Sequence, residues 1–326
     1  MNYNSDTVSV KLPNIKARVY AALKILVAVS LLVYLFSFVE LKNIVSTFLS
    51  SDIRLLALSA VLLVPNIYLQ YLKWKITCDK LIGERSKRKI LLSLFYGFPA
   101  AVFTPARAGE YFGRGLAFKD RSFMEIIFAT FVDKLFTILV TFLFGSIGTV
   151  IFISRYYQSS IYFSIPMIIA YFVFAAITLT FIFSDKEWFY NLFSPFSKFK
   201  LFSKIRERLL ILKNLDRNFV FKMISISTIF FFCYLLQFAI LFAAFSHHID
   251  SVKFLWAAIV IMFAKTILSP LSFSELGVRE GASIFFLTQM GESSSTALNA
   301  SLSLFIINII VPSLIGLFLL FVKNDD

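Results

Sequence analysis

The chain has 326 residues, of which 59% are hydrophobic and 41 are phenylalanine. Soluble domains are about half apolar, so this composition excludes an ordinary soluble protein and indicates an all-α polytopic membrane protein. A net charge of +13 would suggest a nucleic-acid partner in a soluble domain, but here Lys and Arg are sorted by segment, so no nucleic acid is expected.

Six apolar segments predict helices that cross the membrane, because each approaches the roughly 20 residues that span hydrocarbon. They are residues 20–39, 53–72, 123–152, 161–183, 219–245 and 297–322. The first segment ends without a small-residue cleavage site. We therefore expect it to remain as an anchor and not to be removed as a signal peptide.

Basic residues predict which side of the membrane each connection faces, since cytoplasmic connections carry an excess of Lys and Arg. They concentrate in the N-terminal arm, 73–89, 107–121 and 186–222. We expect an integral protein of the cell (cytoplasmic) membrane with both termini in the cytoplasm. Apolar and basic residues alternate at helical spacing in the segment at about 185–222, which predicts a basic amphipathic helix on the cytoplasmic face.

Two shorter apolar segments, 90–104 and 252–269, do not fit as simple spans. The first has basic residues on both flanks, which predicts a re-entrant hairpin at about 90–120 that opens to the cytoplasm. The second belongs to a re-entrant hairpin at about 252–290 that enters from outside. The order of spans and hairpins then repeats in opposite orientation, as in inverted-topology repeats. The two predicted repeats are 1–155 and 156–326.

Each hairpin carries a charged motif, at 104–110 and at 269–280. Ionisable groups at membrane depth are costly, so they are expected to face protein or a water-filled cavity and to act there. Proline and glycine can break a helix at such a point, and the residues concerned are Pro105, Gly109, Pro270 and Gly277.

The charged residues of both motifs predict one shared site for a phosphate-bearing headgroup near the membrane midplane. Guanidinium groups suit bidentate contact with phosphate, and the carboxylates would hold them or accept from the lipid head. The predicted substrate-binding residues are Arg107, Glu110, Arg114, Arg279 and Glu280. The alternative is that each Arg and Glu forms a structural ion pair.

Four further residues are predicted to line the cavity: Asp133, Lys134, Lys265 and Glu275. For Asp133 and Lys134 the alternative is a local ion pair, and Lys265 fits the outer interface equally well. Other polar residues within the spans are expected to form interhelical hydrogen bonds, not to bind ligand. These are Asn66, Gln70, Gln237, Asn299 and Asn308.

No metal and no cofactor are expected. The chain has only two cysteines, Cys78 and Cys233, which argues against a disulfide framework and against a Cys-based metal site. His247 and His248 adjoin each other with only Asp250 close by, which is weak for a metal site.

At its two motifs the chain resembles the lysylphosphatidylglycerol synthase/flippase transmembrane family. The matching residues are Pro105, Arg107, Gly109, Glu110 and Arg114 in the first motif, and Pro270, Ser272, Gly277, Val278, Arg279, Glu280 and Gly281 in the second. The resemblance covers nearly the whole chain. It implies transfer of a lipid between leaflets, in some members an aminoacylated phosphatidylglycerol, and in others a supporting role in polyprenol-linked sugar pathways.

Two features depart from this family. The second motif has residues 274–277, Ser-Glu-Leu-Gly, in place of a glycine-rich turn. The chain also ends at Asp326, soon after its last expected span, so the soluble domain of the bifunctional members and its synthase activity are not expected.

Three functions stay open from the sequence. The first is a flippase-like translocator of a phosphate-bearing lipid, such as an aminoacylated phosphatidylglycerol or a polyprenyl-linked species. The second is an intramembrane enzyme that acts on a lipid phosphate with Glu110 or Glu280 as general base, but no His pair or His/Asp/Ser set accompanies the motifs, so catalysis is not expected. The third is a noncatalytic partner of a lipid synthase or glycosyltransferase. The expected partners are membrane lipids with anionic or zwitterionic phosphate headgroups, together with a separate lipid-modifying enzyme under the third reading.

Overall fold

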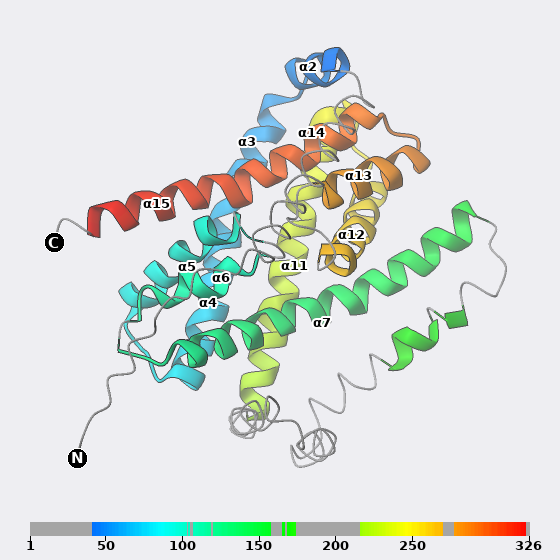
Figure 1. Ribbon diagram of the computed structural model, residues 1–326. Helices are drawn as coiled ribbons and strands as arrows, with labels where there is room; N and C mark the ends of the chain where they lie inside the picture. The colour runs from blue at the N-terminus through cyan, green and yellow to red at the C-terminus, as the bar shows by residue number, and fades with distance from the viewer. Residues whose placement is uncertain are drawn as a thin grey trace, which may run out of the picture.

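The computed structural model describes residues 41–102, 104, 107–118, 120–157, 165–166, 168–173, 216–269 and 277–323, and all regular structure in them is helical (Figure 1). The first group of helices is α2 (Leu41–Leu49), α3 (Ile53–Val61), α4 (Leu63–Thr77), the π-helical turn η1 (Cys78–Ile82), α5 (Lys87–Val102), α6 (Gly109–Gly115) and α7 (Phe123–Tyr156). The second group is α11 (Arg217–Ser246), α12 (Ser251–Leu268), α13 (Val278–Gln289), α14 (Ser294–Phe305), the π-helical turn η6 (Ile306–Ile310) and α15 (Val311–Lys323).

Five helical stretches of the described residues are long and apolar enough to cross a membrane, so the chain is an integral membrane protein. Four of them confirm predicted spans: Ile53–Ile82, Phe123–Tyr156, Arg217–Ser246 and Ser294–Val322. The predicted span at 20–39 lies outside the described residues. Of the predicted span at 161–183, residues 165–166 and 168–173 are described, and they are helical.

The fifth stretch, α12, differs from the prediction. We placed 252–269 in one arm of a re-entrant hairpin, whereas α12 is by length and composition able to cross a membrane itself. The start of α12 and the end of α13 nevertheless lie together. The Lys253 ammonium at the start of α12 pairs with the Glu292 carboxylate just beyond α13, so the chain turns back between them. The depth of this hairpin in the bilayer and the inverted repeat stay predictions.

The other hairpin, formed by α5 and α6, also returns to the end from which it starts. Nζ of Lys89, in the first turn of α5, lies 3.7 Å from the carboxylate of Asp120, beyond α6. The two helices approach closely because Gly109 has no side chain: a Cβ there would overlap the backbone carbonyl of Ala100. The chain therefore enters and leaves this hairpin at one end, and its re-entrant placement in the bilayer stays a prediction.

A methyl group at position 109 is expected to break this packing. Gly109→Ala should destabilise the protein by about 1–3 kcal/mol, because the new Cβ would overlap the backbone of α5, and so lower the unfolding temperature. Gly281→Ala is the matched control, since no atom lies within 4 Å of a Cβ there and alanine is the better helix former. Thermal unfolding in detergent measures both variants. Equal unfolding temperatures would contradict the packing of α5 on α6.

Two of the long helical stretches are interrupted, each beside a proline. Leu62 separates α3 from α4, and Pro65 has no N–H with which to bond the carbonyl of Val61. Pro312 likewise cannot bond the carbonyl of Asn308, and the π-helical turn η6 directly precedes α15. Asn66 follows the first interruption within α4, and Asn308 lies in η6 itself.

These asparagines join three helices through one glutamine. Nδ2 of Asn66 and Nδ2 of Asn308 both donate to Oε1 of Gln237, at 2.6 and 2.8 Å. Nε2 of Gln237 donates in turn to the carbonyl of Ser59 at 2.8 Å. Asn299 donates to the carbonyl of Ile44 at 2.9 Å. The predicted interhelical hydrogen bonding is confirmed for these four amides, whereas Gln70 lines the cavity described below.

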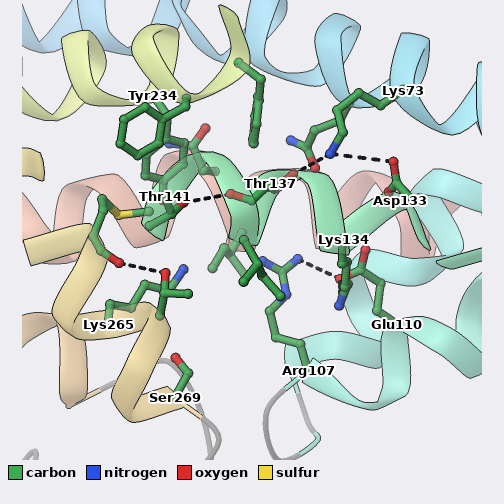
Figure 2. Close-up of a pocket in the computed structure, with 18 of the residues that line it drawn as sticks. Lys73, Arg107, Glu110, Asp133, Lys134, Thr137, Thr141, Tyr234, Lys265 and Ser269 are labelled. Atoms are coloured by element: carbon green, nitrogen blue, oxygen red, sulfur yellow. Dashed lines mark hydrogen bonds and ion pairs between the residues drawn. The ribbon is translucent and has the colours of Figure 1, made fainter. Parts of the chain in front are cut away.

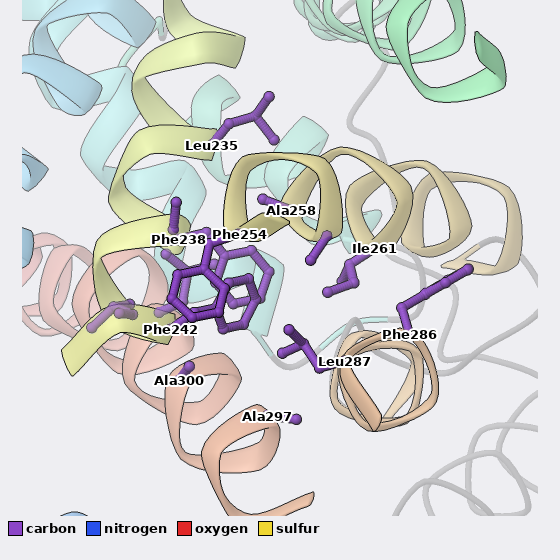
Figure 3. Packing of buried hydrophobic residues seen from close by; sticks show 14 of the residues in the cluster. Leu235, Phe238, Phe242, Phe254, Ala258, Ile261, Phe286, Leu287, Ala297 and Ala300 are labelled. Atoms are coloured by element: carbon purple, nitrogen blue, oxygen red, sulfur yellow. The ribbon is translucent and has the colours of Figure 1, made fainter. Parts of the chain in front are cut away.

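The largest apolar core lies where α11, α12, α13 and α14 meet (Figure 3). Phe238 and Phe242 of α11 pack at a ring separation of 4.2 Å, and Phe254 of α12 follows at 5.9 Å from Phe242. Small residues, Ala297 and Ala300 of α14, are fully buried on the other side. This core packs α12, α13 and α14 together with α11, and α11 also contacts α3, α4 and α7.

Candidate functional site

A cavity of about 380 Å³ lies where α4, α6, α7, α11, α12 and η6 come together (Figure 2). Its described lining includes seven charged side chains. Five are basic, namely Lys73, Arg107, Arg114, Lys134 and Lys265, and two are acidic, namely Glu110 and Asp133. The described lining thus carries an excess of three formal positive charges.

Glu110 is the hub of the charges on one wall. Its Oε1 lies 2.7 Å from Nη2 of Arg114, and its Oε2 lies 2.9 Å from Nζ of Lys134 and 3.3 Å from Nη2 of Arg107. The Glu110 side chain is only 8% exposed, so burial alone would disfavour its charge. Three surrounding cations keep it ionised.

Arg107 has an unusual backbone conformation. Its φ of 56° lies in the left-handed region, which costs a non-glycine residue about 1–3 kcal/mol. Such a conformation persists only where the surrounding structure enforces it, and residues with this backbone strain cluster at functional sites. The first motif therefore shows backbone strain at a charge that lines the cavity.

Asp133 on α7 links the hub to α4. Its Oδ2 lies 3.0 Å from Nη1 of Arg114, and its Oδ1 lies 3.6 Å from Nζ of Lys73. Lys73 also donates to the Thr137 hydroxyl. All three charged groups are nearly buried, with side chains 3–6% exposed. Asp133 thus bridges two basic residues from different helices.

Two of the cations in this cluster also lie over aromatic rings. The Arg114 guanidinium is 4.3 Å from the ring centroid of Trp74, and Nζ of Lys134 is 4.7 Å from that of Tyr111. Cation–π contact of this kind stabilises a cation that has lost part of its water. The aromatic rings and the carboxylates thus hold the same two basic groups.

The opposite wall of the cavity is different in character (Figure 2). On this wall the cavity is lined by Lys265 of α12 and by the hydroxyl-bearing side chains Thr141, Tyr234, Thr266 and Ser269. Among the described lining residues, neither acid comes from α11 or α12. The described part of this wall offers a cation and hydroxyl groups.

The charged pair of the second motif, Arg279 and Glu280, does not line the cavity. Arg279 and Glu280 are fully buried and pair with each other at 2.7 Å, and Glu280 also accepts from the hydroxyl of Ser301. Oε2 of Glu280 accepts from the backbone N–H of Gly277 at 2.7 Å, so Glu280 caps the start of α13. Neither residue is among those that line the cavity. The geometry matches the structural ion pair that we kept as the alternative.

The predicted helix-breaking residues are described only in part. Gly277 has a φ of 87°, a conformation that favours glycine, and it immediately precedes α13. Gly109 serves the close approach of α6 to α5 and lies within the first turn of α6. Pro105, Pro270 and Glu275 lie outside the described residues.

Lys73 is the charged cavity residue that sequence reasoning missed. We counted it among the basic residues of the cytoplasmic segment 73–89, whereas it is 4% exposed and lines the cavity. A signal was present in the sequence, because Asn66, Gln70 and Lys73 recur at spacings of four and three residues. Such spacing places three polar side chains on one face of a helix.

A family model described as the lysylphosphatidylglycerol synthase TM region matches residues 21–316. No curated protein and no solved structure matches the chain. Within the described residues, no group of three His, Cys, Asp or Glu side chains is placed to hold a metal ion.

Proposed function

The chain belongs to the lysylphosphatidylglycerol synthase transmembrane family, and from this premise we propose that it moves a phosphate-bearing lipid between the two leaflets of the membrane. The family links the chain to lipid handling in the membrane, and the matched region is not the catalytic one. One observation carries the step to a translocator. Among the described residues that line a cavity bounded by apolar helices, five are basic and two are acidic.

Phosphate is the group that such a cavity suits. Arginine and lysine donate charge-assisted hydrogen bonds to phosphate oxygens, and these bonds are stronger where water is excluded. An excess of three positive charges is costly in an empty cavity of low dielectric. A lipid phosphate would lower that cost while its acyl chains remain among the apolar side chains outside.

Exposure indicates which cations exchange partners when a lipid binds. The side chains of Arg107 and Lys134 are 22% and 24% exposed, whereas that of Arg114 is 3% exposed. Phosphate oxygens could therefore take the place of Oε2 of Glu110 at Arg107 and Lys134. Arg114 would stay paired with Glu110 and Asp133 and keep the wall intact.

Leaflet transfer in liposomes tests the proposal. Purified protein should move a fluorescent anionic phospholipid from the inner leaflet to the outer one, where a membrane-impermeant quencher reports its arrival. The double variant Arg107→Gln/Lys134→Gln should slow this transfer. Absence of transfer with every phosphate-bearing lipid would contradict the proposal, and covalent change of the lipid in mass spectra would indicate an enzyme instead.

Replacement of Lys265 is expected to affect lipid transfer more than the stability of the protein. Lys265→Gln removes the cation of the described part of the opposite wall, so transfer should fall about tenfold or more, because one phosphate contact of about 1.5–3 kcal/mol is lost. Lys222→Gln is the matched control: this lysine is exposed on α11 and does not line the cavity. Transfer rates and unfolding temperatures of both variants measure the effect. Equal transfer rates in the two variants would exclude a role for Lys265.

A further inference from the structure

We infer that the cavity binds hydroxyl groups of the lipid headgroup through neutral polar side chains, and so takes a lipid whose phosphate carries a polyol or a sugar. The inference rests on the proposed function, because it concerns the ligand of the same cavity and adds a second recognised group to the phosphate. The neutral polar residues concerned, which we call the neutral subsite, are Gln70, Thr137, Thr141, Tyr234 and Asn308.

Helical spacing places the neutral subsite beside the charged wall. On α7, Thr137 follows Asp133 by four residues, and on α4, Gln70 precedes Lys73 by three. Residues at these spacings share one face of a helix. Nζ of Lys73 also donates to the Thr137 hydroxyl, and in Figure 2 Thr137 lies between Lys73 and Tyr234. A headgroup with its phosphate at the charged wall would therefore present its next atoms to the neutral subsite.

The two threonines of the subsite present a donor and an acceptor. Thr137 accepts from Lys73, so its own hydroxyl hydrogen remains for another oxygen. The Thr141 hydroxyl donates to the backbone carbonyl of Thr137 at 2.9 Å and keeps its lone pairs as acceptors. A ligand hydroxyl both donates and accepts. It is therefore complementary to two such groups one helical turn apart.

Gln70 and Tyr234 add two more groups that can bind a ligand. Both line the cavity, and within the described part of the chain neither side chain forms a hydrogen bond. The amide and the phenol can each donate and accept. A polar group that leaves water without a new partner is costly. Hydroxyl groups of a headgroup would supply partners of the right kind to both.

Two buried acceptors of the lining point in the same direction. Oδ1 of Asn308 and Oδ1 of Asp133 accept no hydrogen bond from the described residues, and the two residues are 5% and 4% exposed. Gln237 fixes the Asn308 amide, and Nζ of Lys73 lies 3.6 Å from Oδ1 of Asp133, beyond hydrogen-bond distance. Native structures pair nearly all such oxygens with a donor. A polyol brings O–H donors that suit them.

Phosphate alone would not use this half of the cavity. A phosphodiester offers acceptor oxygens, and the basic side chains of the charged wall are the donors that suit it. The neutral subsite mixes donors with acceptors, as a hydroxyl does. Glycerol, inositol and hexose headgroups share this chemistry, whether a diacylglycerol or a polyprenyl chain carries the phosphate.

Two lipids of equal charge test the inference in detergent, without requiring transport. Phosphatidylglycerol and phosphatidylpropanol with the same acyl chains have the same phosphodiester and differ in the two headgroup hydroxyls. Native mass spectrometry of the purified chain should show phosphatidylglycerol bound about tenfold more tightly, because two net hydrogen bonds are gained. If water alone occupies the neutral subsite, the two lipids should bind equally.

A second pair of lipids distinguishes the source of the hydroxyl groups. A polyprenyl phosphohexose is compared with the matching polyprenyl propyl phosphate, again at equal charge. The pair with the larger ratio of affinities identifies the lipid chain that the cavity accepts. Equal binding within both pairs would overturn the inference.

The double variant Gln70→Met/Tyr234→Phe assigns the effect to the subsite. Neither side chain has a described hydrogen bond, so the fold should be retained. The preference for phosphatidylglycerol should fall severalfold, while the affinity for phosphatidylpropanol should stay unchanged. Tyr68→Phe is the matched control, because Tyr68 is 57% exposed on α4 and is not among the described lining residues. No fall in the double variant, or an equal fall in the control, would overturn the assignment.

Leaflet transfer of the same two phospholipids separates this inference from the proposed function. Selective binding without transfer of either lipid would sustain the neutral subsite and refute the translocator. Equal binding and equal transfer of phosphatidylglycerol and phosphatidylpropanol would sustain the translocator and refute the neutral subsite.

Discussion

Glu110→Gln is expected to lower the free energy of unfolding by about 3–5 kcal/mol and to stop lipid transfer, because removal of one partner strands buried charges. Arg114 would keep only Asp133 as its partner, while Arg107 and Lys134 would both lose the carboxylate oxygen that they share. Glutamine preserves the shape of the side chain, so the loss reports charge. Thermal unfolding in detergent and leaflet transfer in liposomes measure the two effects.

The control for this variant is an ion pair on the surface. Asp79 pairs with Arg85 at 2.8 Å, and the two side chains are 53% and 87% exposed. Asp79→Asn should cost less than about 1 kcal/mol, because solvent screens exposed pairs. A Glu110→Gln protein as stable and as active as Asp79→Asn would show that Glu110 is not the hub of the site.

The second large effect is expected at Asp133. Asp133→Asn should destabilise the protein by about 3–5 kcal/mol, since Lys73 would remain buried with only the Thr137 hydroxyl as a described polar contact. Adding Lys73→Met should recover part of the loss, because it removes the stranded charge and retains an apolar side chain of similar length. The double variant should be more stable than Asp133→Asn by about 1–3 kcal/mol.

A double-mutant cycle of unfolding free energies measures this coupling. The single variant Lys73→Met supplies the fourth corner, in which Asp133 keeps Arg114. If the effects of the two substitutions simply add, Lys73 and Asp133 do not act as a pair. Such a result would remove α4 from the charged wall of the cavity.

Most of the transmembrane helices could be predicted from the sequence, because an apolar run of sufficient length has few alternatives to a span. Basic residues at both ends predict that the α5–α6 hairpin opens to one side of the membrane, and its placement in the bilayer stays a prediction. α12 was harder: its length allows a span, whereas its charged end suggested a hairpin arm. Hydropathy alone does not fix the depth of a helix whose neighbours are unknown.

Sequence reasoning named six of the seven charged residues in the described lining of the cavity, and it also named Arg279 and Glu280, which do not line it. Arg107, Glu110 and Arg114 line the cavity as expected. Arg279 and Glu280 have the same chemistry but lie at the start of α13, where Glu280 bonds the N–H of Gly277. Sequence shows which side chains can bind phosphate, but helix capping and ligand binding use the same groups.

Lys73 illustrates the opposite error. Its position at the end of a predicted span made a cytoplasmic location reasonable, but the helix continues to Ile82. The later end of this helix moves Lys73 from the interface into the protein, where it pairs with Asp133. An error of several residues in a helix boundary thus changes the role of a charged residue.

Photocrosslinking from inside the cavity tests the central claim most directly, namely that a lipid headgroup enters beside the charged wall. Tyr234 lines the cavity, so its replacement by p-azidophenylalanine should give a phospholipid adduct in native membranes. The same replacement at Phe232, which is 43% exposed on α11, reports lipid at the outer surface. We expect Arg107→Gln/Lys134→Gln to weaken the adduct at position 234 and leave that at 232 unchanged. No adduct at 234, or one that these changes do not affect, would contradict the account.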